Sequence, residues 1–208
     1  MDADQLADLI RRAQARNAAA FDALIDEFSP RLYGYLYRLT GSRHEAEDLL
    51  QDVFVRVVKQ IGRYTHDWRF EGWLFRIATN LVRDRIRKAA RGATLIAGDA
   101  TDVFRTVPAS LDGTDPAWQM ETAEQIDQLQ WALGQLSASE REVIMLRHFS
   151  ELSFKEVAEL MGTPMGTALA RAHRGLQRLR SLMRDRTARD GMTPDIIGGV
   201  EPGPTAAF

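Results

Sequence analysis

The sequence contains no cysteine, and this absence excludes disulfide bonds and cysteine-ligated zinc. It has no apolar run near the roughly 18 residues that a membrane-spanning helix needs. Its first ten residues, MDADQLADLI, lack the pattern of a signal peptide. The 4 histidines are scattered along the chain, which favours structural or surface roles over metal binding. We therefore expect a cytoplasmic protein without membrane contact of its own, and with no metal or cofactor.

The formal net charge is only −2, yet the charges are segregated along the 208 residues. Residues 69–91 carry seven Arg or Lys against two acids, and residues 166–189 carry seven arginines against one aspartate. Between these blocks, residues 92–126 carry six acids against one arginine. Two basic blocks indicate two nucleic-acid contacts, and the acidic connector is a segment that DNA would repel.

The first basic block combines an amphipathic helix with an aromatic segment before it. From Trp73 the spacing predicts a long helix with a buried stripe of Leu74, Ile77, Ala78 and Leu81, opposite Arg76, Asn80, Arg83 and Arg87. Tyr64, Trp68, Phe70 and Trp73 are interleaved with Arg63 and Arg69. Cations follow a phosphate backbone, and aromatic rings stack on exposed bases for about 1–3 kcal/mol per base. The segment favours strand-separated DNA or RNA, the alternative being a solvated basic helix with core aromatics.

Three helices are predicted before this block, over residues 4–18, 20–39 and 43–61. The second is expected as one helix or as a pair, because Pro30 could begin a new helix capped by Ser29. Ser42 and Glu45 form a capping-box pattern at the start of the third. The solvent side of this third helix carries Glu45, Asp48 and Asp52, with Glu47 and Gln51 beside them. Such an acidic face indicates either plain solubility or a protein-docking surface.

The second block contains three consecutive helix starts. Ser137 with Glu140 and Ser153 with Glu156 are capping boxes. The turn 162–164 supplies a Gly C-cap, a Thr N-cap and a Pro for the first helical position. The last helix is expected to bury Met165, Ala168, Ala172, Leu176, Leu179 and Met183, and to present Thr167, Arg171, Arg174 and Arg178 outward. This pattern predicts a helix-turn-helix with its basic helix in the major groove, the alternative being a simple helical hairpin.

Three stretches of the sequence carry a recognisable pattern: HEAEDLLQDVFVRV, FEGWLFRIATNLVRDRIRK and LSASEREVIMLRHFSELSFKEVAELMGTPMGT. Together they resemble extracytoplasmic-function (ECF) sigma factors of the sigma-70 family. The resemblance implies an all-α fold of two small helical domains joined by an extended linker. Its expected parts are an N-terminal helix (1–19), the sigma region 2 helical bundle (20–91), an acidic linker (92–125), the sigma region 4 helix-turn-helix (126–187) and a disordered tail (188–208).

The resemblance also implies partners and sites for a sigma factor with no chemistry of its own. The expected partners are bacterial core RNA polymerase, promoter DNA and an anti-sigma factor. Core polymerase would contact Glu47, Asp48, Gln51, Asp52 and Arg56. The promoter −10 element would contact Tyr64, Trp68, Arg69, Phe70, Trp73, Arg76, Asn80, Arg83, Arg87 and Lys88. The −35 element would contact Thr167, Arg171, His173, Arg174 and Arg178.

Two departures from the family pattern concern DNA recognition. Where the family commonly has Lys or Arg followed by Ser, this chain has Leu169 and Ala170. Leu169 lies at the edge of the expected apolar stripe, and the loss of two polar contacts should weaken or redirect recognition of the −35 element. In the −10 loop, Tyr64-Thr65-His66 replaces the often-seen Phe-Arg-Gly, so the −10 preference cannot be copied from relatives.

Two other classes of function are weighed against the sigma factor. A conventional helix-turn-helix regulator would bind operators as a dimer, and would leave residues 42–91 unexplained. An enzyme acting on nucleic acid could use Glu45, Asp48 and Asp52 as metal ligands. Their helix lacks partner ligands and a Gly-rich phosphate loop, so we reject catalysis.

Overall fold

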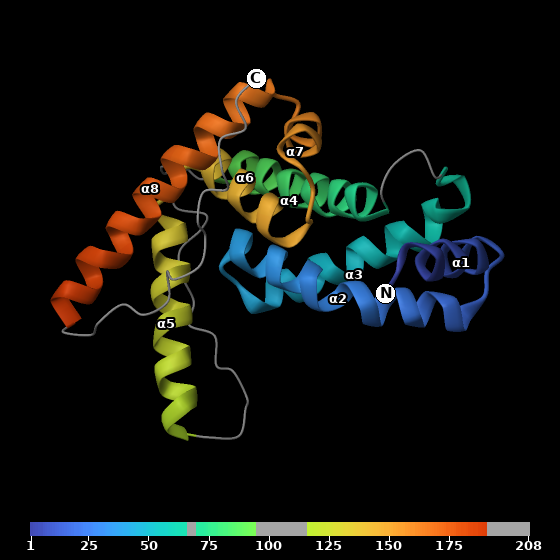
Figure 1. Ribbon diagram of the computed structural model, residues 1–208, viewed down its shortest axis with the longest axis horizontal. Helices are drawn as coiled ribbons and strands as arrows, with labels where there is room; N and C mark the ends of the chain where they lie inside the picture. Colours follow the sequence, from blue (N-terminus) through green and yellow to red (C-terminus); the bar gives the residue numbers. More distant parts are fainter. Residues whose placement is uncertain (66–69, 95–115, 191–208) are drawn as a thin grey trace.

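The computed structural model describes residues 1–65, 70–94 and 116–190, and these ranges fold into helices without any strand, as predicted (Figure 1). In chain order they form α1 (Ala3–Gln14), α2 (Ala18–Thr40), α3 (Arg43–Gln60), the 3-10 turn η1 (Ile61–Arg63), α4 (Phe70–Thr94), α5 (Pro116–Gly134), α6 (Ala138–Phe149), α7 (Phe154–Met161) and α8 (Met165–Asp190). None of the described helices is long and apolar enough to cross a membrane. The predicted tail from 191 onward and the linker residues 95–115 lie outside the described ranges.

Helices α1 to α4 share one core, in which α2 is the central element. The nearly fully buried side chains include Ile10, Leu24, Phe28, Leu32, Leu36, Leu49, Val53, Leu74 and Phe75. Within this core the hydroxyls of Tyr35 on α2 and Thr79 on α4 lie 2.8 Å apart. The stripe predicted for α4 is confirmed, because Leu74, Ile77, Ala78 and Leu81 are all buried.

Helix α2 is a single helix with Pro30 inside it, so the predicted alternative of a helix pair is wrong. An interior proline costs about 3 kcal/mol. The apolar stripe continues across it, because Phe28 before the proline and Leu32 after it are both buried. Burying one such side chain contributes about 1.5–3 kcal/mol, so the continuous stripe outweighs the local cost.

Helices α5 to α8 form the second unit, and α6 is its centre. Both capping boxes predicted for this unit are confirmed, at Ser137 with Glu140 and at Ser153 with Glu156. Of the box predicted at the start of α3, the structure shows the bond from the Glu45 N–H to the Ser42 side chain. In α6 the four consecutive residues from Val143 to Leu146 are all buried. Four neighbours in a helix point in different directions, so α6 must be covered on more than one face. It packs against α8 on one side and against α2 of the first unit on another.

The turn before α8 differs in detail from the prediction. Gly162 adopts the left-handed conformation (φ 65°) and caps α7, as expected. The predicted Thr163 cap is wrong, because its buried hydroxyl has no hydrogen-bond partner among the described residues. Instead the carbonyl of Pro164 accepts from the backbone N–H groups of Thr167 and Ala168. Helix α8 then continues to Asp190, beyond the expected start of the tail at 188.

Small residues set the buried side of α8. Ala168 and Ala172 are buried, and a Cβ added at Gly175 would lie 2.7 Å from Cδ1 of Ile144 in α6. The predicted burial of Met165 and Leu176 is wrong, since they are 51% and 40% exposed. Because the side chains of Ala and Gly are so short, α8 approaches α6 closely along their side, and the longer residues beside them point outward.

Candidate polymerase and nucleic-acid interfaces

The predicted polymerase-docking residues lie on the outer side of α3, with different surroundings. Gln51 and Asp52 are exposed, whereas Glu47, Asp48 and Arg56 are partly buried. Glu47 pairs with Arg43 at 2.9 Å. Asp48 faces Arg85 of α4 at 3.4 Å, so part of the acidic face is neutralised within the first unit.

The same side of α3 carries two apolar residues that the sequence analysis did not single out. Val55 and Val58 are 49% and 56% exposed, and follow Gln51 at the i, i+4 and i+7 positions of one helical face. Their signal in the sequence was their position outside the buried stripe of Ala46, Leu49, Val53 and Val57. An exposed apolar centre with polar residues around it is a feature of protein-docking surfaces.

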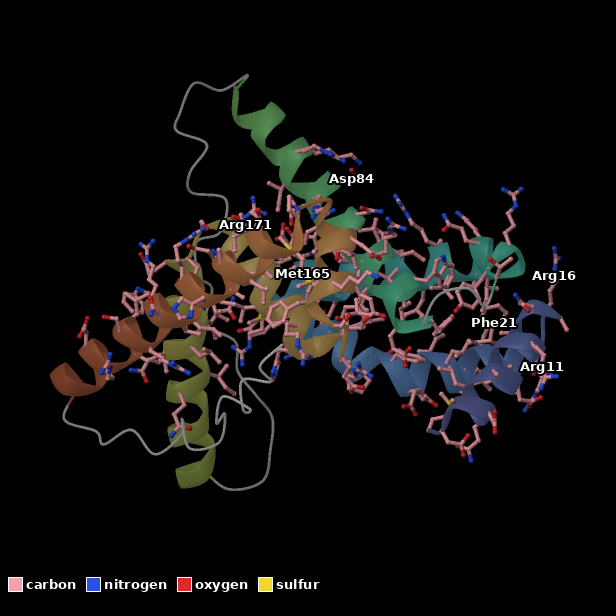
Figure 2. The ribbon with its side chains drawn as sticks, turned by 45° about the horizontal axis from the view of Figure 1, so that its top comes forward. Arg11, Arg16, Phe21, Asp84, Met165 and Arg171 are labelled. Carbon is pink, nitrogen blue, oxygen red and sulfur yellow. The ribbon has the colours of Figure 1, made fainter. Side chains whose placement is uncertain are left out.

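The outer side of α4 carries the predicted −10 cations. Arg76, Asn80, Arg87 and Lys88 are exposed, and Arg83 is partly buried. Arg87 forms an ion pair with Asp84, and this hydrogen bond is the main reason why the pKa of Asp84 is lowered. Figure 2 shows Asp84 on the part of α4 that projects from the molecule. This helix therefore presents a positively charged edge on which a DNA backbone could lie.

Two of the aromatic residues proposed to bind the −10 element belong to the core. Tyr64 and Phe70 are nearly fully buried, with ring centroids 5.5 Å apart, and Phe70 also packs 5.3 Å from Phe28. Trp73 is partly exposed, and the centroid of its ring lies 5.0 Å from that of the Tyr64 ring. The sequence analysis considered two roles for these rings, base stacking and core packing. Tyr64 and Phe70 pack in the core here, while Trp73 is partly accessible. Trp68, Arg69 and His66 lie outside the described residues.

Helix α1 holds the beginning of this aromatic segment. The side-chain amide of Gln14 donates to the carbonyl of Ile61 at 3.1 Å and to that of Tyr64 at 2.8 Å. Ile61 begins η1 and Tyr64 directly follows it, at the start of the aromatic segment predicted to stack on bases. The N-terminal helix thereby fixes one end of the −10 segment.

The predicted −35 residues all lie on α8, the helix that carries Met165 and Arg171 in Figure 2. His173, Arg174 and Arg178 are exposed, while Thr167 and Arg171 are partly buried. Arg174 lies 3.7 Å from Glu140 at the start of α6. The pKa of Glu140 is lowered, mainly by its hydrogen bond with the Ser137 hydroxyl and further by Arg174 and Arg178. The arginines of α8 thus flank an acidic group of their own unit.

The two units pack against each other, and α2 and α6 form most of the contact. Gly34 of α2 faces the Phe149 ring so closely that an added Cβ would lie 2.6 Å from it. Arg31 donates to the carbonyl of Phe149 at 3.0 Å. The buried Arg141 donates to the carbonyl of Leu39 at 3.3 Å.

This contact extends to one residue of the predicted −10 surface. Arg83 of α4 pairs with Glu142 of α6 at 2.9 Å. Three turns earlier in α4, Gly72 lies near Leu152, which precedes α7. The second unit therefore covers one margin of the basic α4 surface while Arg76, Asn80 and Arg87 stay exposed.

Comparison with known proteins gives two family matches that follow the two units. The Sigma-70 region 2 model matches residues 24–92, and the Sigma-70, region 4 model matches residues 126–179. The ECF RNA polymerase sigma factor SigW of Bacillus subtilis is 34% identical over 178 residues, covering 85% of this chain and 95% of its own. The RNA polymerase sigma factor CarQ of Myxococcus xanthus is 34% identical over 164 residues, covering 79% and 89%.

Solved structures show the same architecture. The sigma factor RpoE of Bartonella quintana, crystallised with the anti-sigma factor NepR, aligns with a TM-score of 0.62 at 26% identity, over 79% of this chain and 96% of RpoE. CnrH, in complex with the cytosolic domain of CnrY, aligns with a TM-score of 0.59 at 23% identity and supports the fold alone. With both sigma regions present in order, and with SigW matched over nearly its whole length, the chain belongs to the ECF sigma factors of the sigma-70 family.

Proposed function

We propose that this ECF sigma factor docks on core RNA polymerase through α3 and contacts the two promoter elements through α4 and α8. The observation that carries the proposal is the division of exposed chemistry among three helices. The outer side of α3 is acidic and apolar, whereas α4 and α8 present arginines. A polymerase subunit and a DNA backbone require these different surfaces.

For the −10 element, the proposed contacts are the exposed Arg76, Asn80, Arg87 and Lys88, together with Trp73. Removing a base from the stack costs a few kcal/mol, so promoter opening needs cations on the backbone and a ring to receive the base. Trp73 is the partly accessible ring beside these cations. Tyr64 and Phe70 would act by packing against the Trp73 ring and holding it in place.

For the −35 element, the proposed contacts are Thr167, Arg171, His173, Arg174 and Arg178 on α8. Helix-turn-helix proteins place the second helix in the major groove, and an Arg can bind guanine with two hydrogen bonds. Arg174 is exposed in the third turn of this helix and is the arginine that we assign to a base contact.

The packed arrangement of the two units suggests a form that precedes DNA binding. While Arg83 is paired with the partly buried Glu142, part of its guanidinium is unavailable to a phosphate. Full engagement of the −10 surface would therefore require α4 and α6 to separate. We infer that the packed form is the one that an anti-sigma factor binds, since RpoE was crystallised with such a factor.

The family consists of transcription initiation factors rather than enzymes, and we extend the absence of catalysis to this chain. Within the described ranges, no group of three or more His, Asp or Glu side chains is placed to hold a metal ion. The remaining alternative is an operator-binding regulator, which would act without polymerase and would use no docking surface on α3.

The purified chain, mixed with bacterial core RNA polymerase, tests the proposal. Genomic fragments are transcribed in vitro, and the start sites are mapped to find the −10 and −35 elements. We expect co-purification with core enzyme and transcription that depends on both elements. Specific DNA binding by the chain alone, with no association with core enzyme, would support the operator-binding alternative instead.

A further inference from the structure

The outward surface of α8 has an apolar part where a recognition helix would meet bases. Leu169 is 39% exposed and Ala170 beside it is also exposed. They lie in the first two turns of the helix, four residues before the exposed His173 and Arg174. Residues four apart share a face, so one surface combines two apolar side chains with an imidazole and a guanidinium.

This surface is turned away from the core of its own unit. Ala168 and Ala172 are buried on the inner side of α8, and Gly175 lies directly against Ile144 and Glu140 of α6, so the helix has no room to rotate. Leu169 lies at the margin of that contact, and Ala170 lies nearly opposite it. Their exposure is therefore fixed by the packing of α8, and needs no rearrangement of the second unit.

Leucine and alanine side chains have no hydrogen-bond donor or acceptor. Of the groups that base edges present in the major groove, the C5-methyl group of thymine is the apolar one. A cytosine amino group or a guanine carbonyl facing Leu169 would lose its water without gaining a partner. The chemistry of this surface thus favours thymine over the other bases.

We propose that Leu169 and Ala170 recognise thymine methyl groups in the −35 element and thereby determine its sequence. This proposal rests on the proposed function of α8 as the recognition helix. The surroundings favour DNA as the occupant, because Arg174, Arg178 and Arg180 lie on the exposed part of the same helix. Phosphate contacts by Arg178 and Arg180 would hold the helix in the groove, Arg174 would contact a neighbouring base, and the apolar pair would select the thymine.

Templates in which single −35 thymines are replaced by deoxyuridine test the proposal directly. Deoxyuridine pairs as thymine does but lacks the C5-methyl group. With the full chain assembled on core polymerase, at least one replacement should weaken −35-dependent binding about three- to fourfold, the factor expected for one buried methyl group. Leu169→Ala or Ala170→Gly should lower the affinity for thymine DNA and abolish the difference between the two templates.

Leu176→Ala is the matched control. Leu176 is 40% exposed, like Leu169, but lies two turns further along α8. This variant should keep the full response to deoxyuridine. Leu169→Arg, which restores the family's usual cation, should keep binding strong by adding a phosphate or guanine contact, but should remove the thymine preference.

Two results would overturn the proposal. One is equal binding of every deoxyuridine template and its thymine counterpart by the unmodified chain. The other is an unchanged response to deoxyuridine in both the Leu169→Ala and the Ala170→Gly variants. That result would overturn the proposal even if Leu169→Ala weakened the binding of an anti-sigma factor. In either result, −35-dependent binding itself would persist, whereas failure of the proposed function would abolish it.

Discussion

Arg83 of α4 and Glu142 of α6 form an ion pair of 2.9 Å that joins the two helical units. Both side chains are partly buried, with relative exposures of 33% and 17%. The Glu142 carboxylate is therefore paired with the Arg83 guanidinium, which the sequence analysis assigned to contact with the −10 element. The net gain from such a pair is modest, because desolvation of the charges opposes their attraction.

The charge reversal Glu142→Arg should separate the two units. It would place a third guanidinium near those of Arg83 and Arg171, both of which act on Glu142. Small-angle scattering should show a larger radius of gyration for this variant. The double variant Arg83→Glu with Glu142→Arg is the matched control and should restore the packed dimensions. An unchanged radius in the single variant would show that this pair does not control the packing.

The packing of the units should depend on pH through Glu142. Burial raises its pKa above the ordinary value of 4.5, and the nearby Arg83 and Arg171 lower it by less. The packed form therefore binds more protons than the separated form. The stabilisation from this carboxyl is fully present below pH 4.5, and is lost as the pH rises through the raised pKa.

Energy transfer between one dye on each unit, followed from pH 4 to pH 8, measures this dependence. Glu142→Gln should reduce the change with pH, and the difference between the two titrations isolates this residue from other carboxyls. Superimposable titration curves for the two proteins would contradict the assignment.

Gly34→Ala should loosen the same interface without changing any charge. Replacing a helical glycine with alanine normally stabilises the helix by about 0.5–1 kcal/mol. Here the new methyl group would lie 2.6 Å from the Phe149 ring, so the ring must move or the units must part. We expect a larger radius of gyration for the variant. Combining it with Phe149→Ala, which removes the opposing ring, tests whether the clash is the cause.

Val55→Lys with Val58→Glu should weaken binding to core polymerase at least tenfold. Both residues are exposed on α3, so the fold should tolerate the change, and circular dichroism can verify this. The double substitution adds no net charge, which leaves loss of the apolar centre as the cause. Lys59→Ala, an exposed change on the same helix, serves as the control. Equal retention on immobilised core enzyme would remove these valines from the docking surface.

Tyr35→Phe should destabilise the first unit by about 1–3 kcal/mol, because the Thr79 hydroxyl would lose its buried partner. Urea unfolding measures this loss. Adding Thr79→Val, which removes the second polar group, should recover part of the stability. A single variant as stable as the unmodified chain would mean that water replaces the lost hydroxyl.

Most helix boundaries could be predicted because their signals are local. Ser137 and Glu140 satisfy each other within four residues, and Gly162 ends α7 by its own backbone conformation. Such features need no knowledge of the tertiary structure. For the same reason the basic face of α4 and the arginines of α8 could be placed on their helices from spacing alone.

The packing between units could not be predicted in this way. Burial of four consecutive residues of α6 needs α2 as a second neighbour, and the close approach of Phe149 to Gly34 is a tertiary contact that spacing along the chain does not reveal. The aromatic residues Tyr64 and Phe70 posed a related problem. A ring that stacks on a base and a ring that fills a core are the same residue type, and their neighbours decide between the two roles.

The contact of α8 through alanine and glycine has a consequence for how such regulators diversify. Since the fold depends on the short residues Ala168, Ala172 and Gly175, the residues on the opposite side carry little of the stability. They can change one at a time without a compensating change in the core. New promoter preferences would then be accessible by single mutations in an otherwise constant protein.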